Sequence, residues 1–215
     1  MYHKSGTTEA DSVYCLYAKK GLIMKIYLMR HGETDWNQER RLQGQKDIAM
    51  NENGIRQIQE LAARLRDRGI SFDRIVSSPL RRAAQSAEIV ASQTGYCIED
   101  IVLEPLLKER DFGAAEGVTY RERRTRSDAE WGMESKDVLC ERALSGIKRH
   151  LGADRGKGVL FVAHGSILKA AVAALAAGKI EYDDDLQFRQ GNISLLEYSQ
   201  GQVTAIHPNL LGAAD

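Results

Sequence analysis

Cysteine is scarce in this sequence, and neither sign of charge is in excess. The three cysteines, Cys15, Cys97 and Cys140, are an odd number, lie far apart and form no Cys-x-x-Cys pair. This pattern argues against a disulfide framework or a cysteine zinc site and is typical of reduced thiols in a cytoplasmic protein. Thirty lysines and arginines balance thirty aspartates and glutamates. The chain therefore lacks the overall field that would attract a nucleic acid or a membrane surface.

Long apolar runs are also missing. No run approaches the roughly 18 residues that a membrane span requires, and residues 1–21 lack the charged start and long apolar core of a signal peptide. We expect residues 1–21 to form a mobile extension and residues 22–215 to form a single domain with a sizeable core. The sequence leaves open whether Met24 is the natural start.

The chain does contain strand and helix patterns that alternate. Short continuous apolar runs predict strands at residues 21–29, 72–77, 98–103 and 159–163. Two further runs, near the end of the chain, predict a hairpin or a sheet edge around residues 200–201. The alternation predicts an α/β fold, a three-layer αβα sandwich with a mostly parallel central sheet.

Helices are predicted where apolar residues recur at helical spacing. One follows the N-cap Asn51, and a second begins at Ser78 with Pro79 as its first residue. A third begins near residues 134–135, and an alanine-rich helix follows the last predicted parallel strand. The buried faces of the first and third helices are expected to include Ile55 and Val138.

Histidine and arginine side chains come directly after the predicted strands. Arg30 and His31 end the first strand, and His164 follows the fourth. Arg81 and Arg82 open the helix after the second strand. Because the carboxyl ends of parallel strands meet at one edge of a sheet, these side chains should gather there.

This set of side chains is suited to a phosphoryl group. Arginine offers a fork of donors to phosphate oxygens, and histidine can act as a nucleophile or proton carrier near neutral pH. The sequence has no nucleotide-binding Gly-x-x-x-x-Gly-Lys loop and no carboxylate pair at metal-ligand spacing. Two alternatives remain: the first Arg-His-Gly is a structural turn, or the histidines bind zinc, which the neighbouring arginines disfavour by repulsion.

Five segments, in this order, carry a resemblance to a known family. They are residues 28–37, 41–44, 77–83, 107–117 and 162–165. The sequence resembles the histidine phosphatase superfamily, in the branch with cofactor-dependent phosphoglycerate mutases and many small-molecule phosphatases. The resemblance implies the same sandwich fold and an enzyme that acts on a phosphoryl group. The residue set above suggests that the site works without a nucleotide or a metal, so we expect no cofactor.

The resemblance also implies roles for particular residues. His31 would attack phosphorus and become a phosphohistidine, with its other ring nitrogen donating to a backbone carbonyl. Arg30, Arg82 and His164 would surround the phosphoryl oxygens. The family pattern selects Arg82 over Arg81, which is then expected at the surface.

Glu109 would be the proton donor and acceptor. The resemblance implies that it protonates the leaving oxygen and then activates water. Burial and a neighbouring phosphate would favour the protonated form of Glu109, whereas Arg30 and Arg82 would favour its carboxylate, so the direction of its pKa shift stays open. The alternative interpretation is that Glu109 is a loop carboxylate paired with an arginine such as Arg110. Candidate substrate contacts are Arg30, Asn37, Gln43, Gly44, Arg82, His164 and Gly165, with Ser166 and Asn192 as weaker ones. Asn192 also fits a turn.

The sequence departs from the family in the segment around the predicted acid. Ala115 stands where relatives commonly have a bulky aromatic residue, and the segment between Glu109 and His164 is short for a mutase. Less cover over the site should admit water. The arginine-rich residues 120–126 fit either a solvated helix face or a funnel for anions.

The combined prediction is a metal-independent phosphomonoesterase acting on a small phosphorylated metabolite. A phosphoglycerate mutase and a non-catalytic phospho-ligand binder are the alternatives. The sequence names neither the substrate nor the oligomeric state, since the residues that would bind the rest of the substrate lie in loops.

Overall fold

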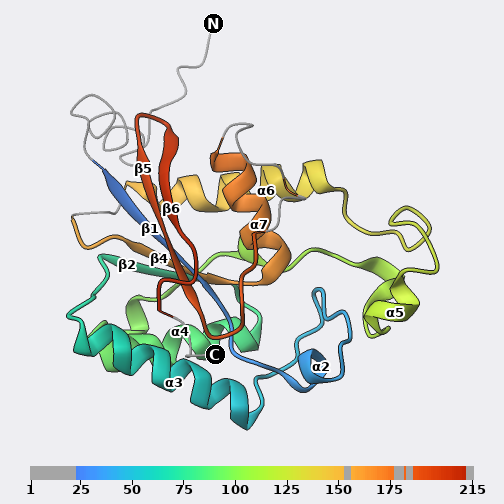
Figure 1. Cartoon of the computed structure of the whole chain (residues 1–215), viewed down its shortest axis with the longest axis horizontal. Helices are drawn as coiled ribbons and strands as arrows, with labels where there is room; N and C mark the ends of the chain where they lie inside the picture. Colours follow the sequence, from blue (N-terminus) through green and yellow to red (C-terminus); the bar gives the residue numbers. More distant parts are fainter. Residues whose placement is uncertain (1–22, 153–155, 177–181, 183–185, 212–215) are drawn as a thin grey trace, which may run out of the picture.

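The computed structural model describes residues 23–152, 156–176, 182 and 186–211. The predicted extension over residues 1–21 lies outside these residues. Among the described residues, strands and helices occur in the predicted alternating order (Figure 1).

A sheet of six strands within the described residues forms the middle of the structure. Its order is β3-β2-β4-β1-β5-β6. The strands are β1 (Met24–Arg30), β2 (Arg74–Ser77), β3 (Val102–Leu103), β4 (Val159–Ala163), β5 (Ile193–Ser199) and β6 (Gln202–His207). The first four strands in the sheet order pair in parallel, whereas β5 and β6 add an antiparallel hairpin. The prediction of a mostly parallel sheet is confirmed.

Helices cover both faces of the sheet. The helices α3 (Glu52–Asp67) and α4 (Arg81–Thr94) pack on one face, and α6 (Lys136–Leu151) and α7 (Gly165–Leu175) on the other (Figure 1). Alternate residues of β1 serve the two layers, since Ile26 and Leu28 join one hydrophobic cluster and Tyr27 and Met29 the other. The predicted three-layer sandwich is therefore confirmed.

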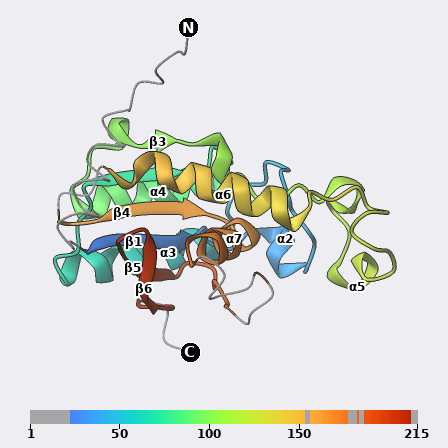
Figure 2. The same ribbon diagram turned by 90° about the horizontal axis from the view of Figure 1, so that it is seen from above.

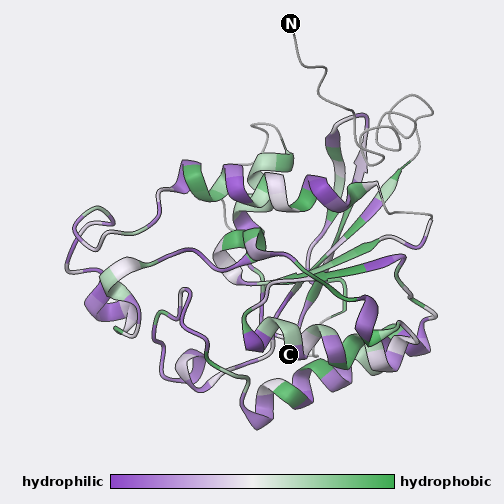
Figure 3. Cartoon of the chain, turned by 180° about the vertical axis from the view of Figure 1, so that it is seen from behind, coloured by the Kyte–Doolittle hydropathy of each residue, from purple (hydrophilic) through white to green (hydrophobic). Residues whose placement is uncertain are grey.

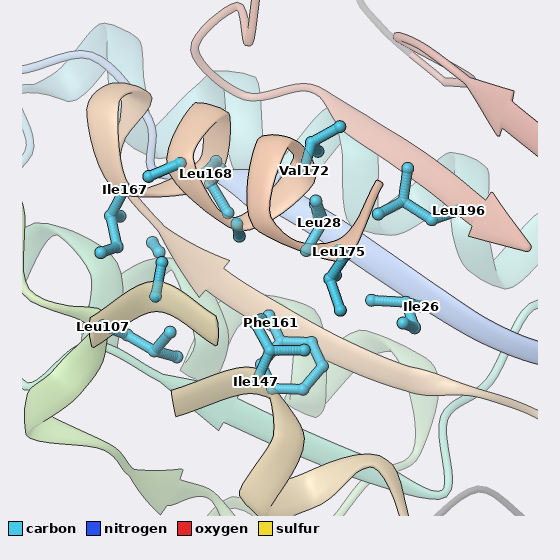
Figure 4. Close-up of a cluster of buried hydrophobic side chains, with 14 of the residues drawn as sticks. Ile26, Leu28, Leu107, Ile147, Phe161, Ile167, Leu168, Val172, Leu175 and Leu196 are labelled. Atoms are coloured by element: carbon cyan, nitrogen blue, oxygen red, sulfur yellow. The ribbon is translucent and has the colours of Figure 1, made fainter. Parts of the chain in front are cut away.

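The cluster beneath α6 and α7 is drawn in Figure 4, where Phe161 of β4 lies close to Ile147 of α6. In Figure 3 the central strands are mostly green, which marks the hydrophobic residues that both helical layers cover. A strand that is buried on both faces has a nearly continuous apolar sequence. For this reason β1 and β4 could be predicted from the sequence.

Short elements lie in the connections between the strands and the main helices. They are α2 (Asp35–Gln38), α5 (Tyr120–Arg123) and the 3-10 turns η1 (Ile98–Asp100), η2 (Pro105–Leu107) and η3 (Gly113–Ala115). Figures 1 and 2 both place α2 and α5 past the same end of the sheet. The segments with α2 and α5 are joined by an isolated bridge between Arg41 and Thr119.

Four local predictions need correction. The helix α4 begins at Arg81 and has Leu80 as its N-cap, not Ser78; the Ser78 hydroxyl accepts from the Leu80 N–H and binds a buried histidine ring, not an N–H of the helix. Ile55 and Val138 are exposed, because each is one residue, about 100° around its helix, from the buried stripe. The predicted strand over 98–103 consists of η1 followed by only two strand residues.

Candidate active site

The loop after β1 is fixed by close contact with the start of α3. A Cβ on Gly32 would clash with the carbonyl oxygen of Gly54, and a Cβ on Gly54 would clash with the backbone of Glu33. The backbone N–H of His31 donates to Ala163 O at the end of β4, at 3.1 Å. Two glycines and one interstrand bond therefore set the position of His31.

The His31 ring is held as a neutral imidazole. Its Nδ1 lies 2.7 Å from Gly32 O, so Nδ1 carries the proton and Nε2 keeps its lone pair. Burial, followed by the charges of Arg82 and Arg30, holds the pKa of His31 well below its ordinary value of 6.5. The ring is therefore unprotonated at Nε2 near neutral pH, as a nucleophile requires.

Arg82 is completely buried and uses each of its guanidinium nitrogens. Nη1 donates to Lys46 O at 2.7 Å, Nη2 to Gly44 O at 2.8 Å, and Nε to His164 Nδ1 at 3.1 Å. Burial lowers the pKa of Arg82 to about 10. The guanidinium is therefore a cation at neutral pH.

Arg30 supplies a second buried cation with an unused donor. Its Nη1 donates to Phe188 O at 2.8 Å, but its buried Nε has no hydrogen-bond partner among the described residues. Burial lowers the pKa of Arg30, and the charge of Glu109 opposes that shift. A buried donor without a partner is costly unless a ligand satisfies it. An anion bound here would do so.

Glu109 lies at the N-terminus of α7. Its Oε1 accepts from the backbone N–H of Ile167 at 3.1 Å and of Arg110 at 2.9 Å, and its Oε2 accepts from that of Ser166 at 3.3 Å. The Arg110 guanidinium binds Asp128 instead, at 2.9 Å. The alternative reading of Glu109 as the partner of the Arg110 side chain is therefore wrong.

A cavity of about 360 Å³ connects these groups. Among the predicted residues, its lining includes Arg30, His31, Asn37, Gln43, Gly44, Arg82, Glu109, Gly165 and Ser166. The structure thus brings the proposed nucleophile and both arginines to one cavity, as the strand-end argument predicted, and it adds Glu109, which only the resemblance had indicated. Their chemical roles stay predictions.

Two predicted contacts do not reach the cavity in this structure. His164 is fully buried, and both of its ring nitrogens are engaged, Nδ1 by Arg82 Nε and Nε2 by Ser78 Oγ at 2.8 Å. It lies beside His31, with 5.1 Å between ring centroids, but it is not a lining residue. Asn192 is also absent from the lining; its Oδ1 accepts from Ile193 N, and its carbonyl accepts from Arg30 N. The turn reading fits Asn192 better.

The weaker contacts differ in what they offer a ligand. The Oδ1 of Asn37 accepts from the Thr34 backbone and hydroxyl in a capping box, and its amide nitrogen has no hydrogen bond to any residue that the structure describes. The buried Oε1 of Gln43 has no partner among the described residues. Gly44 has a φ of +52°, a left-handed conformation that favours glycine, and a Cβ there would also meet the Glu116 carboxylate.

Sequence reasoning missed several lining residues. They are Arg41, Leu42, Phe112, Tyr120, Lys169, Tyr182, Gln187 and Phe188. Lys169 had a usable signal, since it is one helical turn after Gly165 and therefore shares its face of α7. The arginines of residues 120–126 are not part of the lining; Arg123 binds Asp128, and Arg126 lies over the Trp131 ring. The funnel reading of that segment is not supported.

The chain matches the family model of the histidine phosphatase superfamily (branch 1) over residues 26–210. It belongs to that superfamily, as the resemblance predicted. The "uncharacterized phosphatase PhoE" of Bacillus subtilis is 39% identical over 158 residues, 73% of this chain and 79% of that protein. The "probable phosphoglycerate mutase GpmB" of Cronobacter sakazakii is 34% identical over 194 residues, 83% of this chain and 86% of that protein.

Solved structures share the fold. The alpha-ribazole phosphatase from Shigella flexneri superposes with a TM-score of 0.73 at 25% sequence identity, over 86% of this chain and 96% of that one. No helix in the described part of the chain is long and apolar enough to cross a membrane. Within the same residues, no group of three or more histidine, cysteine, aspartate or glutamate side chains is arranged to hold a metal ion.

Proposed function

We propose that this protein is a metal-independent phosphomonoesterase that hydrolyses a small phosphorylated metabolite through a phosphohistidine on His31. The observation that carries the proposal is the state of the His31 ring. Its Nδ1 proton is held by Gly32 O, and its pKa is depressed by burial and two arginines. The Nε2 lone pair is therefore available in a cavity that Arg30 and Arg82 also line. Their guanidinium groups are suited to bind phosphoryl oxygens.

The residues of the cavity can perform both halves of the reaction. His31 Nε2 forms a bond to phosphorus while the bond to the ester oxygen breaks, and protonated Glu109 gives its proton to that oxygen. Arg30 and Arg82 stabilise the negative charge on the phosphoryl oxygens. In the second half, the Glu109 carboxylate takes a proton from water as the water oxygen attacks phosphorus and the N–P bond breaks. Inorganic phosphate leaves, and both side chains return to their initial states.

A phosphoglycerate mutase is the second candidate, because relatives at 34% identity are named as probable mutases. In a mutase the phosphohistidine returns its phosphoryl group to substrate instead of water. Incubation with 3-phosphoglycerate and a trace of bisphosphoglycerate separates the two. Formation of 2-phosphoglycerate without free phosphate would contradict the phosphatase proposal.

The main test is phosphate release from a panel of phosphorylated metabolites in the presence of a metal chelator. We expect activity on at least one small phosphomonoester and its loss in His31→Ala. The control is His207→Ala, which changes a half-exposed histidine on the edge strand β6. Acid quenching during turnover should trap one phosphoryl group on the peptide with His31. Undiminished turnover in His31→Ala would contradict the mechanism.

A further inference from the structure

Arg142 makes an unusually complete set of hydrogen bonds near the proposed acid. An arginine side chain has five N–H donors, and five hydrogen bonds of the Arg142 guanidinium are present. Nε and Nη2 bind the two carboxylate oxygens of Glu134, each at 2.8 Å. The other three donors bind backbone carbonyls. Both side chains of the ion pair are largely buried.

The three carbonyls belong to the segment that carries Glu109. Nη1 donates to Leu106 O and Lys108 O, each at 2.8 Å, and Nη2 donates to Glu109 O at 3.3 Å. Arg142 stands on α6, so these bonds tie the Glu109 segment to the core helix layer. The segment itself has only 3-10 turns and no strand around Glu109.

Glu134, the ion-pair partner of Arg142, binds the backbone on the C-terminal side of Glu109. Its Oε2 accepts from the backbone N–H of Asp111 at 3.2 Å, and its own N–H donates to Asp111 O at 2.9 Å. Burial raises the pKa of Glu134, but the hydrogen bond and charge of Arg142 outweigh burial and lower it overall. The pair is therefore ionised at neutral pH. It holds the backbone on both sides of the proposed acid.

The two ends of Glu109 have different partners. Its carbonyl faces Arg142, whereas its carboxylate binds the first N–H groups of α7 beside the cavity. Fixing the backbone from which a carboxylate projects also fixes the distance from that carboxylate to a bound ester oxygen. Errors of about 1 Å in such a distance can cost on the order of 100-fold in rate.

We infer that Arg142, through its ion pair with Glu134, is the positioning residue that places the Glu109 carboxylate for proton transfer. This inference rests on the proposed function. Arg142 does not line the cavity, so it acts through Glu109 and not on the substrate. Lysine cannot replace it, because a single ammonium group cannot reach a bidentate carboxylate and three separate carbonyls.

The test compares two leaving groups. Nitrophenolate departs from 4-nitrophenyl phosphate without needing a proton, whereas the alkoxide of glycerol phosphate needs one. For Arg142→Met we expect kcat/KM to fall about 100-fold with glycerol phosphate and by less than about 10-fold with 4-nitrophenyl phosphate. Arg142→Lys should show the same contrast, and Glu109→Gln a stronger one. Inhibition by inorganic phosphate should be unchanged in all three, because the phosphoryl site is intact.

The matched control is Lys148→Met, which removes one positive charge from an exposed position of the same helix and should change neither substrate. Equal losses with both substrates in Arg142→Met would mean a merely structural role and would overturn the inference. Removing Arg142 alone leaves a buried carboxylate without its partner and can prevent folding. The double variant Arg142→Met/Glu134→Met avoids that, and equal losses in it would overturn the inference too.

Failure of the proposed function has a different signature. In that case the wild-type protein releases phosphate from neither compound nor from any member of the metabolite panel, or His31→Ala keeps its activity. If instead the wild type is active and Glu109→Gln discriminates between the two leaving groups while Arg142→Met does not, the phosphatase proposal stands and the positioning role of Arg142 is wrong.

Discussion

Arg82 and His164 form a buried pair in which the arginine fixes the tautomer of the histidine. The Arg82 Nε donates to His164 Nδ1 at 3.1 Å, and because a guanidinium nitrogen is only a donor, Nδ1 must be the acceptor. The proton of His164 is therefore on Nε2, which donates to Ser78 Oγ at 2.8 Å. Burial, followed by the charges of Arg82 and His31, holds the pKa of His164 well below 6.5. The pair thus carries one positive charge, on Arg82.

Ser78→Ala should destabilise the protein, because it leaves the buried Nε2–H of His164 without an acceptor. We expect the free energy of unfolding to fall by about 1–3 kcal/mol, measured by urea denaturation. The control Ser92→Ala removes an exposed hydroxyl bond from α4 and should change stability by less than about 0.5 kcal/mol. Equal effects of the two substitutions would show that the Ser78 hydroxyl is not the acceptor that His164 needs.

Stability should fall on the acid side of neutrality. His31 and His164 have pKa values depressed in the folded state, so the unfolded chain binds more protons as the pH drops. Their contribution is complete above about pH 6.5, the unfolded value, and is lost as the pH falls toward the folded values. Because Arg82 and a proton on either ring would repel a proton on the other, both rings resist protonation in the folded state, and their two contributions to the loss add.

Substituting His31 tests directly whether its depressed pKa makes the protein less stable as the pH falls. Between about pH 6.5 and 5, His31→Gln should reduce the slope of unfolding free energy against pH by roughly 1.4 kcal/mol per pH unit, the value for one proton. His207→Gln, on a half-exposed histidine, should leave the slope unchanged. A wild-type stability that is flat over this window would contradict a depressed pKa. The kcat/KM of the wild type should likewise persist below pH 6.5, since His31 Nε2 stays unprotonated there.

The sequence predicted the parts of the structure that depend on local pattern. Residues 159–163 form β4 within the predicted bounds, Asn51 caps α3, and Ser135 caps α6. Strands buried on both faces and capped helices leave signals within a few residues. The gathering of Arg30, His31 and Arg82 also followed, because parallel strands end at one edge.

Long-range side-chain pairing was not predictable in the same way. Serine is a preferred N-cap residue, which is why Ser78 was predicted to cap a helix. Its hydroxyl binds His164, which is 86 residues away in the sequence. The acceptors of Arg82 in residues 44–46 and the five bonds of Arg142 likewise join segments whose separation only the fold fixes. The position of the His164 ring, which is buried and outside the cavity lining, depends on its bonds to Arg82 and Ser78. For this reason its predicted exposure to the phosphoryl group did not follow.

Gly54→Ala should impair catalysis from outside the cavity. The new Cβ would clash with the backbone of Glu33 and displace the loop that begins at His31. We expect a fall in kcat on the order of 100-fold from displacement of the nucleophile, together with a destabilisation of about 1–3 kcal/mol from overpacking. The control Gln59→Ala changes an exposed position of the same helix. If Gly54→Ala turns over substrate at the wild-type rate, the glycine contact does not position His31.

Lys169 should determine which substrates bind. It lines the cavity one turn along α7 from Gly165, and no hydrogen bond or ion pair joins its side chain to any residue in the described ranges. The proposed mechanism assigns Arg30 and Arg82 to the phosphoryl oxygens, so we expect Lys169 to bind a second anionic group of the substrate. A charge-assisted hydrogen bond of about 1.5 kcal/mol corresponds to roughly a tenfold change in affinity.

Lys169→Met should therefore raise KM about tenfold for phosphomonoesters that carry a further carboxylate or phosphate, and leave KM unchanged for those with a neutral remainder, such as glycerol phosphate. The measurement is steady-state phosphate release with both kinds of substrate, and Lys148→Met on the exposed face of α6 is the charge-matched control. A rise in KM of the same size for both kinds of substrate would place the ammonium group against the phosphoryl oxygens instead. In that outcome, inhibition by inorganic phosphate would weaken by the same factor, because the lost contact would be common to substrate and product.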